Sequence, residues 1–290
     1  MVKSYLLQPA YFRLDGGAMY GIIPKPLWNK KHPSDELNRI DLALRLWVIK
    51  TKDRVICIDT GIGDYHSEKF IHQFDIRGPS DPLTHALSEI NLKKEDITDL
   101  VLSHLHFDHV GGLTEIKNEK PICAFPNATI HLHKDHYDYS LKASLKDSGS
   151  FHKENYQPII ESFKQNQKLA WLQGDQGIIL EDNDYKLQFR ISHGHTPFLV
   201  HPYDEFFIYL ADIIPTSHHI HIPWIMAYDI EPTKTAKYKQ DILDFVIEKD
   251  LTVIFEHDPD YWGSKVMKNE KNKYIAKAPF DADRFSVIKI

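Results

Sequence analysis

The chain has 290 residues, 42% of them hydrophobic and 26% charged, which is the balance of a globular protein able to bury a sizeable core. A net charge of -6 gives no electrostatic reason to expect a nucleic-acid partner. No segment approaches the roughly 20 apolar residues that span a bilayer, and the N-terminal residues lack the apolar run of a secretory signal. Cys57 and Cys123 lie in apolar stretches, as buried free thiols do in a reducing compartment. We therefore expect a cytoplasmic protein with neither nucleic acid nor membrane as partner.

Strand-like and helix-like segments alternate along the chain. In chain order, the apolar pattern and the turn residues predict strands over 42–49 and 55–59, a helix over 80–92, strands over 99–106 and 128–133, helices within 135–167, strands over 168–173, 177–181, 185–192 and 205–212, a helix over 231–250 and a strand over 251–258. No repeat or linker interrupts this pattern. We expect one α/β domain over residues 1–290, with sheets inside and helices outside.

Several of the predicted strands end next to a residue that can bind a metal ion. Asp59, His104, His195, Asp212 and His257 each follow or end an apolar segment. Strand ends can meet at one edge of an α/β sheet, which is where proteins of this class place their sites. We therefore expect these side chains to lie close together.

The densest cluster is SHLHFDH, which contains His104, His106, Asp108 and His109. Imidazole nitrogens and carboxylate oxygens together suit a borderline divalent cation such as zinc. On an extended turn His104 and His106 point to the same side, whereas Asp108 and His109 lie toward a second metal position. A solvated polar loop is the alternative, but the dense mixture of ligand types favours a metal site.

Two other histidine groups have weaker patterns. His131 and His133 stand in a predicted strand with no acid between them, which favours surface histidines over ligands. His218, His219 and His221 form a similar group, which we do not assign to a metal. His193 is interpreted as a neighbour of the site and not as a ligand.

SHLHFDHVGG (103–112) resembles the H-x-H-x-D-H signature of the metallo-β-lactamase superfamily. Four further blocks resemble that family and occur in its order: DTGIGD (59–64), ISHGHTP (191–197), YLAD (209–212) and FEHD (255–258). Together the five blocks are highly specific. The resemblance implies the αββα sandwich of that family, an α/β fold with two mixed sheets inside and helices outside.

The resemblance also implies two divalent metal ions, zinc first, with manganese, iron or cobalt also compatible with such ligands. The first ion would have three histidine ligands: His104, His106 and His195. The second would have three ligands: Asp108, His109 and His257. Asp212 would bridge the two ions, and Asp59 would brace the metal loop without binding metal. For single residues the alternatives are a strand-end cap at Asp212 and a core histidine at His257, which the ordered blocks disfavour.

The resemblance further implies a hydrolase, because redox di-iron members carry an acid at the position of His106. Two cations lower the pKa of a shared water, so that hydroxide is available as the nucleophile near neutral pH. Asp108 would carry the proton to the leaving group.

Two apolar segments, Gly16–Trp28 and Pro223–Asp229, are candidates for the substrate wall. Core packing or a dimer surface is the alternative. We single out six of their side chains as substrate contacts: Met19, Tyr20, Trp28, Trp224, Met226 and Tyr228. Both segments resemble the N-acyl-homoserine lactonase branch, which opens lactones in quorum quenching. Residues 1–40 are thus a substrate or dimer segment, and a homodimer is expected.

The chain also departs from that branch. Pro215 stands three residues after Asp212, where the lactonases have a tyrosine, and Tyr228 or Tyr20 is the candidate replacement. Phe198 follows Thr-Pro where glycine is usual. The leading hypothesis is a dinuclear hydrolase of lactones or related esters with an apolar chain or aryl group. An organophosphate or phosphoester hydrolase is the enzymatic alternative, and a metal-binding interaction protein is the non-enzymatic one.

Overall fold

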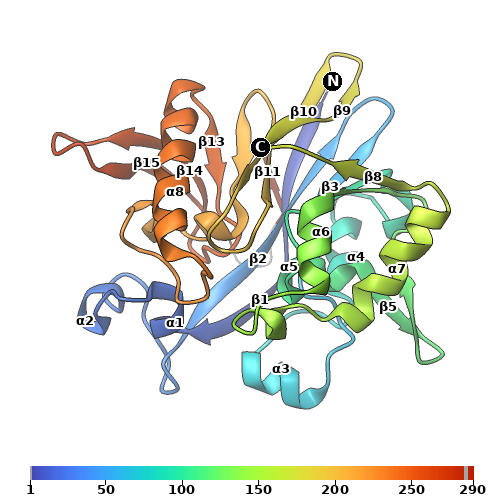
Figure 1. Cartoon of the computed structure of the whole chain (residues 1–290), viewed down its shortest axis with the longest axis horizontal. Coiled ribbons are helices and arrows are strands. Elements are labelled where there is room, and N and C mark those ends of the chain that lie inside the picture. The colour runs from blue at the N-terminus through green and yellow to red at the C-terminus, as the bar shows by residue number, and fades with distance from the viewer. Residues whose placement is uncertain (1, 284–286) are drawn as a thin grey trace.

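The computed structural model describes residues 2–283 and 287–290, and its two large sheets lie between layers of helices (Figure 1). The first sheet has the order β16-β1-β2-β3-β4-β7-β8. Its strands are β1 (Lys3–Asp15), β2 (Arg39–Lys50), β3 (Val55–Ile58), β4 (Asp99–Val101), β7 (Thr129–His133), β8 (Leu169–Leu172) and β16 (Val287–Lys289). Pairing is parallel from β3 to β8 and antiparallel elsewhere, so the sheet is mixed.

The second sheet has the order β15-β14-β13-β12-β11-β10-β9. Its strands are β9 (Gln176–Asp182), β10 (Tyr185–Ser192), β11 (Leu199–Tyr203), β12 (Phe207–Tyr209), β13 (Thr252–Ile254), β14 (Tyr261–Lys268) and β15 (Tyr274–Asp281). Only β12 and β13 pair in parallel. A separate ribbon joins β5 (Thr114–Lys117) to β6 (Lys120–Cys123).

The helices flank the two sheets. They are α1 (Gly16–Tyr20), α2 (Lys25–Trp28), α3 (Glu68–Phe74), α4 (Pro82–Ser88), α5 (Phe107–Val110), α6 (Lys134–Leu141), α7 (Lys153–Gln165) and α8 (Pro232–Glu248). In Figure 1, α8 lies on the side of β13–β15, and α4, α6 and α7 lie on the side of β3 and β8. Among the residues that the structure describes, no helix is long and apolar enough to cross a membrane.

Strand β2 shows why the sheets stack, because successive side chains of a strand point to opposite faces. Trp47 and Ile49 belong to a buried cluster that also contains Phe189 of β10 in the second sheet. Leu46 and Val48 instead belong to a cluster with helix residues of α4 and α7. Both faces of β2 are therefore buried, one against the other sheet and one against helices. This arrangement confirms the predicted αββα sandwich.

Most predicted elements are present, with different bounds. The strand predicted over 205–212 is only β12, and Asp212 lies in a 3₁₀ turn over Ala211–Ile213. Asp81 is the N-cap of α4 and accepts a hydrogen bond from the backbone of Thr84. Strands β1, β5, β6, β11, β14, β15 and β16 were not predicted. Pro9 obscures β1 in the sequence, and the register of β1 shifts between Leu7 and Ala10.

The topology brings several strand ends together. Asp59 follows β3 and Ser103 follows β4, and these two strands are parallel neighbours. Asp212 follows β12 and Glu256 follows β13, the parallel pair of the second sheet. Because parallel strands present equivalent ends to the same edge, the four loops meet where the two sheets face each other.

Candidate metal centre

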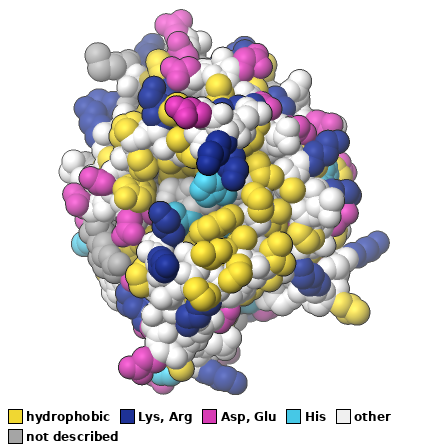
Figure 2. Space-filling view, turned by 90° about the vertical axis from the view of Figure 1, so that its left-hand side faces the viewer, with side chains coloured by type: hydrophobic (Ala, Val, Ile, Leu, Met, Phe, Trp, Pro, Cys, Tyr) yellow, Lys and Arg dark blue, Asp and Glu magenta, His cyan; other side chains and the backbone are white. Residues whose placement is uncertain are grey.

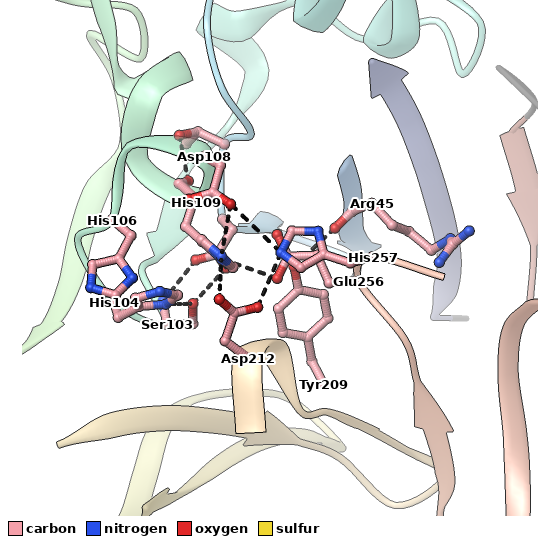
Figure 3. Close-up of polar contacts among 12 residues, drawn as sticks. Arg45, Ser103, His104, His106, Asp108, His109, Tyr209, Asp212, Glu256 and His257 are labelled. Atoms are coloured by element: carbon pink, nitrogen blue, oxygen red, sulfur yellow. Dashed lines mark hydrogen bonds and ion pairs between the residues drawn. The ribbon is translucent and has the colours of Figure 1, made fainter. Parts of the chain in front are cut away.

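The carboxylate of Asp212 lies between two sets of histidine nitrogens. Its Oδ2 is 3.1 Å from Nε2 of His195 and 3.6 Å from Nε2 of His109. Its Oδ1 is 3.0 Å from Nε2 of His257. Figure 3 shows His109 and His257 pointing toward this carboxylate from different loops. One carboxylate thus contacts histidines of both potential ligand sets, as a carboxylate shared by two cations does.

The first set of potential ligands comes from two loops and the Asp212 turn. One ligand atom from each of four buried residues lies within 4.8 Å of the others: His104, His106, His195 and Asp212. Nδ1 of His106 and Nε2 of His195 are 3.1 Å apart. Nε2 of His104 is buried and has no hydrogen-bond partner among the described residues. Buried nitrogens without partners are costly unless a cation binds them, so this set fits a divalent ion.

The second set contains one residue that we did not single out from the sequence. Its four members with mutually close ligand atoms are His109, Asp212, Glu256 and His257. The predicted ligand Asp108 is absent from this set, although its Oδ2 lies 3.8 Å from Nε2 of His109 and 3.7 Å from Nε2 of His257. Asp108 therefore faces the same nitrogens from slightly further away.

Glu256 lies on the opposite side of the His109 ring from Asp212. Its Oε2 is 3.0 Å from Nδ1 of His109, whereas Asp212 faces Nε2. Glu256 thus adds negative charge beside the nitrogen that also contacts Asp59, a position suited to orienting the His109 ring. The sequence signal for Glu256 was its place beside His257 after a buried strand, but a strand-end acid is too common to identify alone.

Most of these histidines are held through the ring nitrogen that faces away from Asp212. Nδ1 of His257 donates to the carbonyl of Ala43 at 2.8 Å, and Nδ1 of His195 donates to Oδ1 of Asp229 at 3.0 Å. Nδ1 of His104 donates to Ser103 Oγ at 3.0 Å. Contacts of this kind set the ring orientation and tautomer of metal-binding histidines.

Asp59 lies behind the loop that carries the first histidines. It accepts hydrogen bonds from the backbone N–H of Ser103 at 2.7 Å and from its hydroxyl at 2.6 Å. Its Oδ2 is also 3.1 Å from Nδ1 of His109. Asp59 itself has a φ of 57°, a left-handed conformation that is uncommon outside glycine. This turn allows one carboxylate to reach both the loop and the ring.

Arg45, a buried arginine of β2, holds the backbone around His257. The guanidinium of Arg45 donates to the backbone carbonyls of Phe255 and Asp258, on either side of Glu256 and His257. The backbone N–H of Arg45 also donates to the carbonyl of Glu256 at 3.2 Å. Figure 3 shows Arg45, Glu256 and His257 on the same side of the close-up. The end of the second sheet is thereby tied to the first sheet.

The electrostatics of the cluster follow from its buried carboxylates. Burial opposes a charge on His195, but Asp212 and Asp229 outweigh it and raise its pKa to about 10. Burial likewise opposes a charge on His257, yet Asp212 and Glu256 raise its pKa to about 9. Burial raises the pKa of Glu256 itself to about 7. Positive charge nearby therefore stabilises the buried carboxylates. Divalent cations can supply that charge in place of protons.

The pKa values of His104 and His106 are shifted in the opposite direction. Burial, together with the neighbouring imidazoles, lowers the pKa of His104 and of His106 well below the usual value. Both rings are therefore neutral near neutral pH. A neutral imidazole is the form that binds a metal ion.

A cavity of about 280 Å³ opens above the cluster. Its floor includes His106, Asp108, His195, Asp212 and His257. Its apolar wall comes from Leu14, Met19, Phe74, Phe107, Met226 and Ala227, and Tyr228 also borders it. Polar side chains of the 146–150 segment complete the rim.

Three of the six predicted substrate residues line this cavity: Met19, Met226 and Tyr228. The other three, Tyr20, Trp28 and Trp224, lie behind the wall. The ring of Tyr20 stacks on Trp28 with centroids 5.5 Å apart and meets the edge of Trp224 at 5.4 Å. Large aromatic side chains at these positions support the wall because their rings pack on one another. Phe74 and Phe107 in the wall and Lys146 at the rim were not predicted from the sequence.

The two predicted wall segments are joined to each other. The backbone N–H of Ala227 donates to the carbonyl of Ala18 at 2.7 Å. The ammonium group of Lys239, on α8, is buried and donates to the carbonyls of His221 and Trp224 at 2.8 and 2.7 Å. Lys239 thus fixes the backbone of the loop that precedes Met226 and Tyr228.

Two interpretations of histidines are wrong. His131 and His133 are buried, not on the surface. Nε2 of His131 is 2.8 Å from Oδ1 of Asp99, and Nε2 of His133 donates to the carbonyl of Gly174. Their partners come from other strands and loops, which the local pattern does not reveal.

His193 is outside both ligand sets, and its Nδ1 accepts a hydrogen bond from the backbone N–H of Phe198.

Phe198 has an unusual backbone conformation, and His219 packs against an aromatic ring behind the cavity wall. Phe198 has a φ of 59°, so a bulky residue here adopts the conformation for which glycine is usual. His219 stacks on Tyr20 with ring centroids 5.0 Å apart, and its Nε2 donates to the carbonyl of Met19. This histidine supports the cavity wall and does not belong to either ligand set.

Comparison with known proteins agrees with this geometry. A model of the metallo-beta-lactamase superfamily matches residues 46–257. The chain is 25% identical over 175 residues to the N-acyl homoserine lactonase AttM of Agrobacterium fabrum, covering 58% of this chain and 61% of that protein. The match thus spans about three fifths of the relative's length. A shorter match of 84 residues, 29% identical, covers 26% of this chain and 34% of an N-acyl homoserine lactonase of Bacillus cereus.

Solved structures share the fold over nearly the whole chain. A probable metal-dependent hydrolase from Staphylococcus aureus has a TM-score of 0.79 at 24% identity, covering 96% of this chain and 98% of its own. AidC, a dizinc quorum-quenching lactonase, has a TM-score of 0.71 at 21% identity, covering 97% and 96%. Since the family model extends from β2 to His257 and so includes every block of the candidate centre, the chain belongs to the metallo-beta-lactamase superfamily.

Proposed function

We propose that this chain is a hydrolase that holds two divalent ions and opens lactones of the N-acyl-homoserine type or related esters. The observation that carries the proposal is the Asp212 carboxylate between two sets of buried histidine nitrogens, beneath an apolar cavity. Membership in the superfamily and the lactonase relatives indicate a metal-dependent hydrolase. The names of those relatives support the lactone as substrate.

The proposed ligands are those that the motif implied. His104, His106 and His195 would hold the first ion, Asp108, His109 and His257 would hold the second, and Asp212 would be shared by both. When bound, the ions supply a hydroxide nucleophile near neutral pH and polarise the ester carbonyl. Zinc suits this mixture of imidazole and carboxylate, and manganese, iron or cobalt are compatible with it.

The chain's own residues orient the substrate and move the proton. Asp108 lies on the cavity floor, where its carboxylate can take a proton as the tetrahedral centre forms and return it to the ring oxygen as the carbon–oxygen bond breaks. The side chains of Leu14, Met19 and Met226 offer apolar contact to an acyl chain or aryl group.

The test combines metal analysis with a substrate panel. We expect about two ions per chain, hydrolysis of N-acyl-homoserine lactones, and a loss of turnover of at least about 100-fold after chelation that added zinc reverses. Fewer than one ion per chain, with no gain from zinc, cobalt or manganese, would exclude the metal centre. Turnover of a phosphotriester without lactone turnover would favour the phosphoester alternative, and bound metal without any turnover would favour a binding protein.

Replacing Glu256 tests the second ion. In Glu256→Gln the residue keeps its shape but loses the charge beside Nδ1 of His109, which lowers the basicity of that ligand. We expect binding of one of the two ions to weaken by about 10–100-fold, measured by competition with a chromophoric chelator. The exposed Glu205→Gln is the matched control, and equal affinities in both variants would contradict the assigned role.

Tyr228 is the proposed replacement for the tyrosine that Pro215 displaces. Partial burial, with Asp15 and Asp108 nearby, raises the pKa of Tyr228 to about 12, so the hydroxyl keeps its proton and can donate to a carbonyl. For Tyr228→Phe we expect kcat/KM on the lactone to fall roughly 10-fold, the value of one hydrogen bond, with unchanged metal content. Tyr5→Phe, away from the cavity wall, serves as the control. Wild-type kinetics in Tyr228→Phe would refute the proposal that Tyr228 replaces the missing tyrosine.

We also propose that residues 1–40 contribute a homodimer surface. Ile22, Leu27 and Leu37 are 88%, 55% and 65% exposed. Figure 2 faces the side of the molecule that carries α1 and α2 and shows hydrophobic side chains gathered beside a hollow. A contiguous exposed apolar patch is typical of an interface.

Light scattering after size exclusion tests this surface. We expect a mass of two chains for the wild type and of one chain for Leu27→Asp, because a buried charge opposes association. Phe206→Asp, also at an exposed hydrophobic residue, should leave the dimer intact. A wild-type chain that elutes as a monomer would disprove the assembly without bearing on the hydrolase.

A further inference from the structure

A buried histidine outside both ligand sets joins the two loops that carry the first set. His136 stands in the first turn of α6 and is fully buried. Its Nε2 accepts a hydrogen bond from the backbone N–H of Leu105 at 2.9 Å. Its Nδ1 donates to the backbone carbonyl of Pro197 at 2.8 Å. Leu105 lies between His104 and His106, and Pro197 follows His195 by two residues.

The chemistry of these partners specifies one form of the ring. An amide N–H can only donate and a carbonyl can only accept, so both bonds form only when the ring is neutral and carries its proton on Nδ1. Burial lowers the pKa of His136 to about 4, in agreement with a neutral ring. With both nitrogens engaged, His136 cannot bind a metal ion itself.

The packing around His136 continues to the ligands. The ring of Phe151 lies 6.0 Å from that of His136 and 4.7 Å from that of His106, and the His104 ring is 6.2 Å from His136. The His106 and His195 nitrogens that face each other are 3.1 Å apart. A small shift between the two loops would change this distance directly, because each loop carries one of the pair.

We propose that His136 is a positioning residue that fixes the separation of the 104–106 and 195–197 loops and so prepares the site of the first ion. The proposal rests on the proposed function only in that the two loops bind a cation, and it makes no use of the substrate. Both bonds go to the backbone, so the ligand loops are linked whichever side chains they carry.

Two replacements separate this role from general core stability. His136→Leu removes both hydrogen bonds and leaves a buried N–H and carbonyl unpaired. His136→Gln restores one acceptor and one donor, since a carboxamide offers both. The matched control is His201→Leu, which removes another fully buried histidine, whose Nε2 is bonded to Ser192 and to neither of these loops.

The experiment measures metal binding without substrate. Zinc affinity is determined by chelator competition, and the visible absorption bands of the cobalt-substituted protein report ligand geometry. We expect His136→Leu to bind one ion about 10–100-fold more weakly, with altered cobalt bands, and His136→Gln to recover most of the affinity. His201→Leu should lower the melting temperature but keep both the affinity and the bands.

Wild-type affinity and cobalt bands in His136→Leu would overturn the proposal, as would equal losses in His136→Leu and His201→Leu. If His136→Leu does not fold, His136→Met provides the same comparison with His136→Gln, and equal affinities in these two would also overturn it. A wild-type protein that binds two ions but hydrolyses no lactone would refute the substrate alone and leave the role of His136 intact. A wild type that binds no ion would refute both.

Discussion

The structure depends on one buried carboxylate, that of Asp212. Its two oxygens face histidines from three separate loops. A buried charge is stable only when it is compensated, so the loops must arrive together for the fold to tolerate it. Asp59, Asp229 and Glu256 add further buried negative charge behind the rings. The cluster therefore favours bound positive charge.

The supporting contacts come from parts of the chain that do not touch the cavity. Arg45 holds the strand end that carries His257, Asp59 holds the 103–109 loop, and Lys239 holds the loop before Met226. Arg45 and Lys239 bond mainly to backbone carbonyls, whereas Asp59 bonds to one backbone N–H and to two side chains. Backbone contacts set the position of a loop independently of its side chains, so the site can keep its geometry while the cavity wall varies. The residues that position the loops and those that form the cavity wall are thus different residues of the same fold.

The strands and helices were predicted well where the hydrophobic pattern of the sequence is periodic. Strand β2 and helix α8 were predicted from alternation and from helical spacing, because burial of one face or both imposes those periods. Strand β1 was missed because Pro9 and a register shift break its alternation. The burial of His131 was also missed, since its partner Asp99 lies on a neighbouring strand and no local signal reports it.

By itself the sequence determined the candidate ligands: a six-residue motif contains four of them, and covalent spacing alone keeps those side chains close together. It also determined that acids and histidines stand at the ends of buried strands. Only the tertiary structure decided that Glu256 and Asp229 face the outer nitrogens of His109 and His195, and that Tyr20, Trp28 and Trp224 lie behind the cavity wall. The reason is physical, because these contacts join segments far apart in the chain and depend on how two sheets and their loops pack.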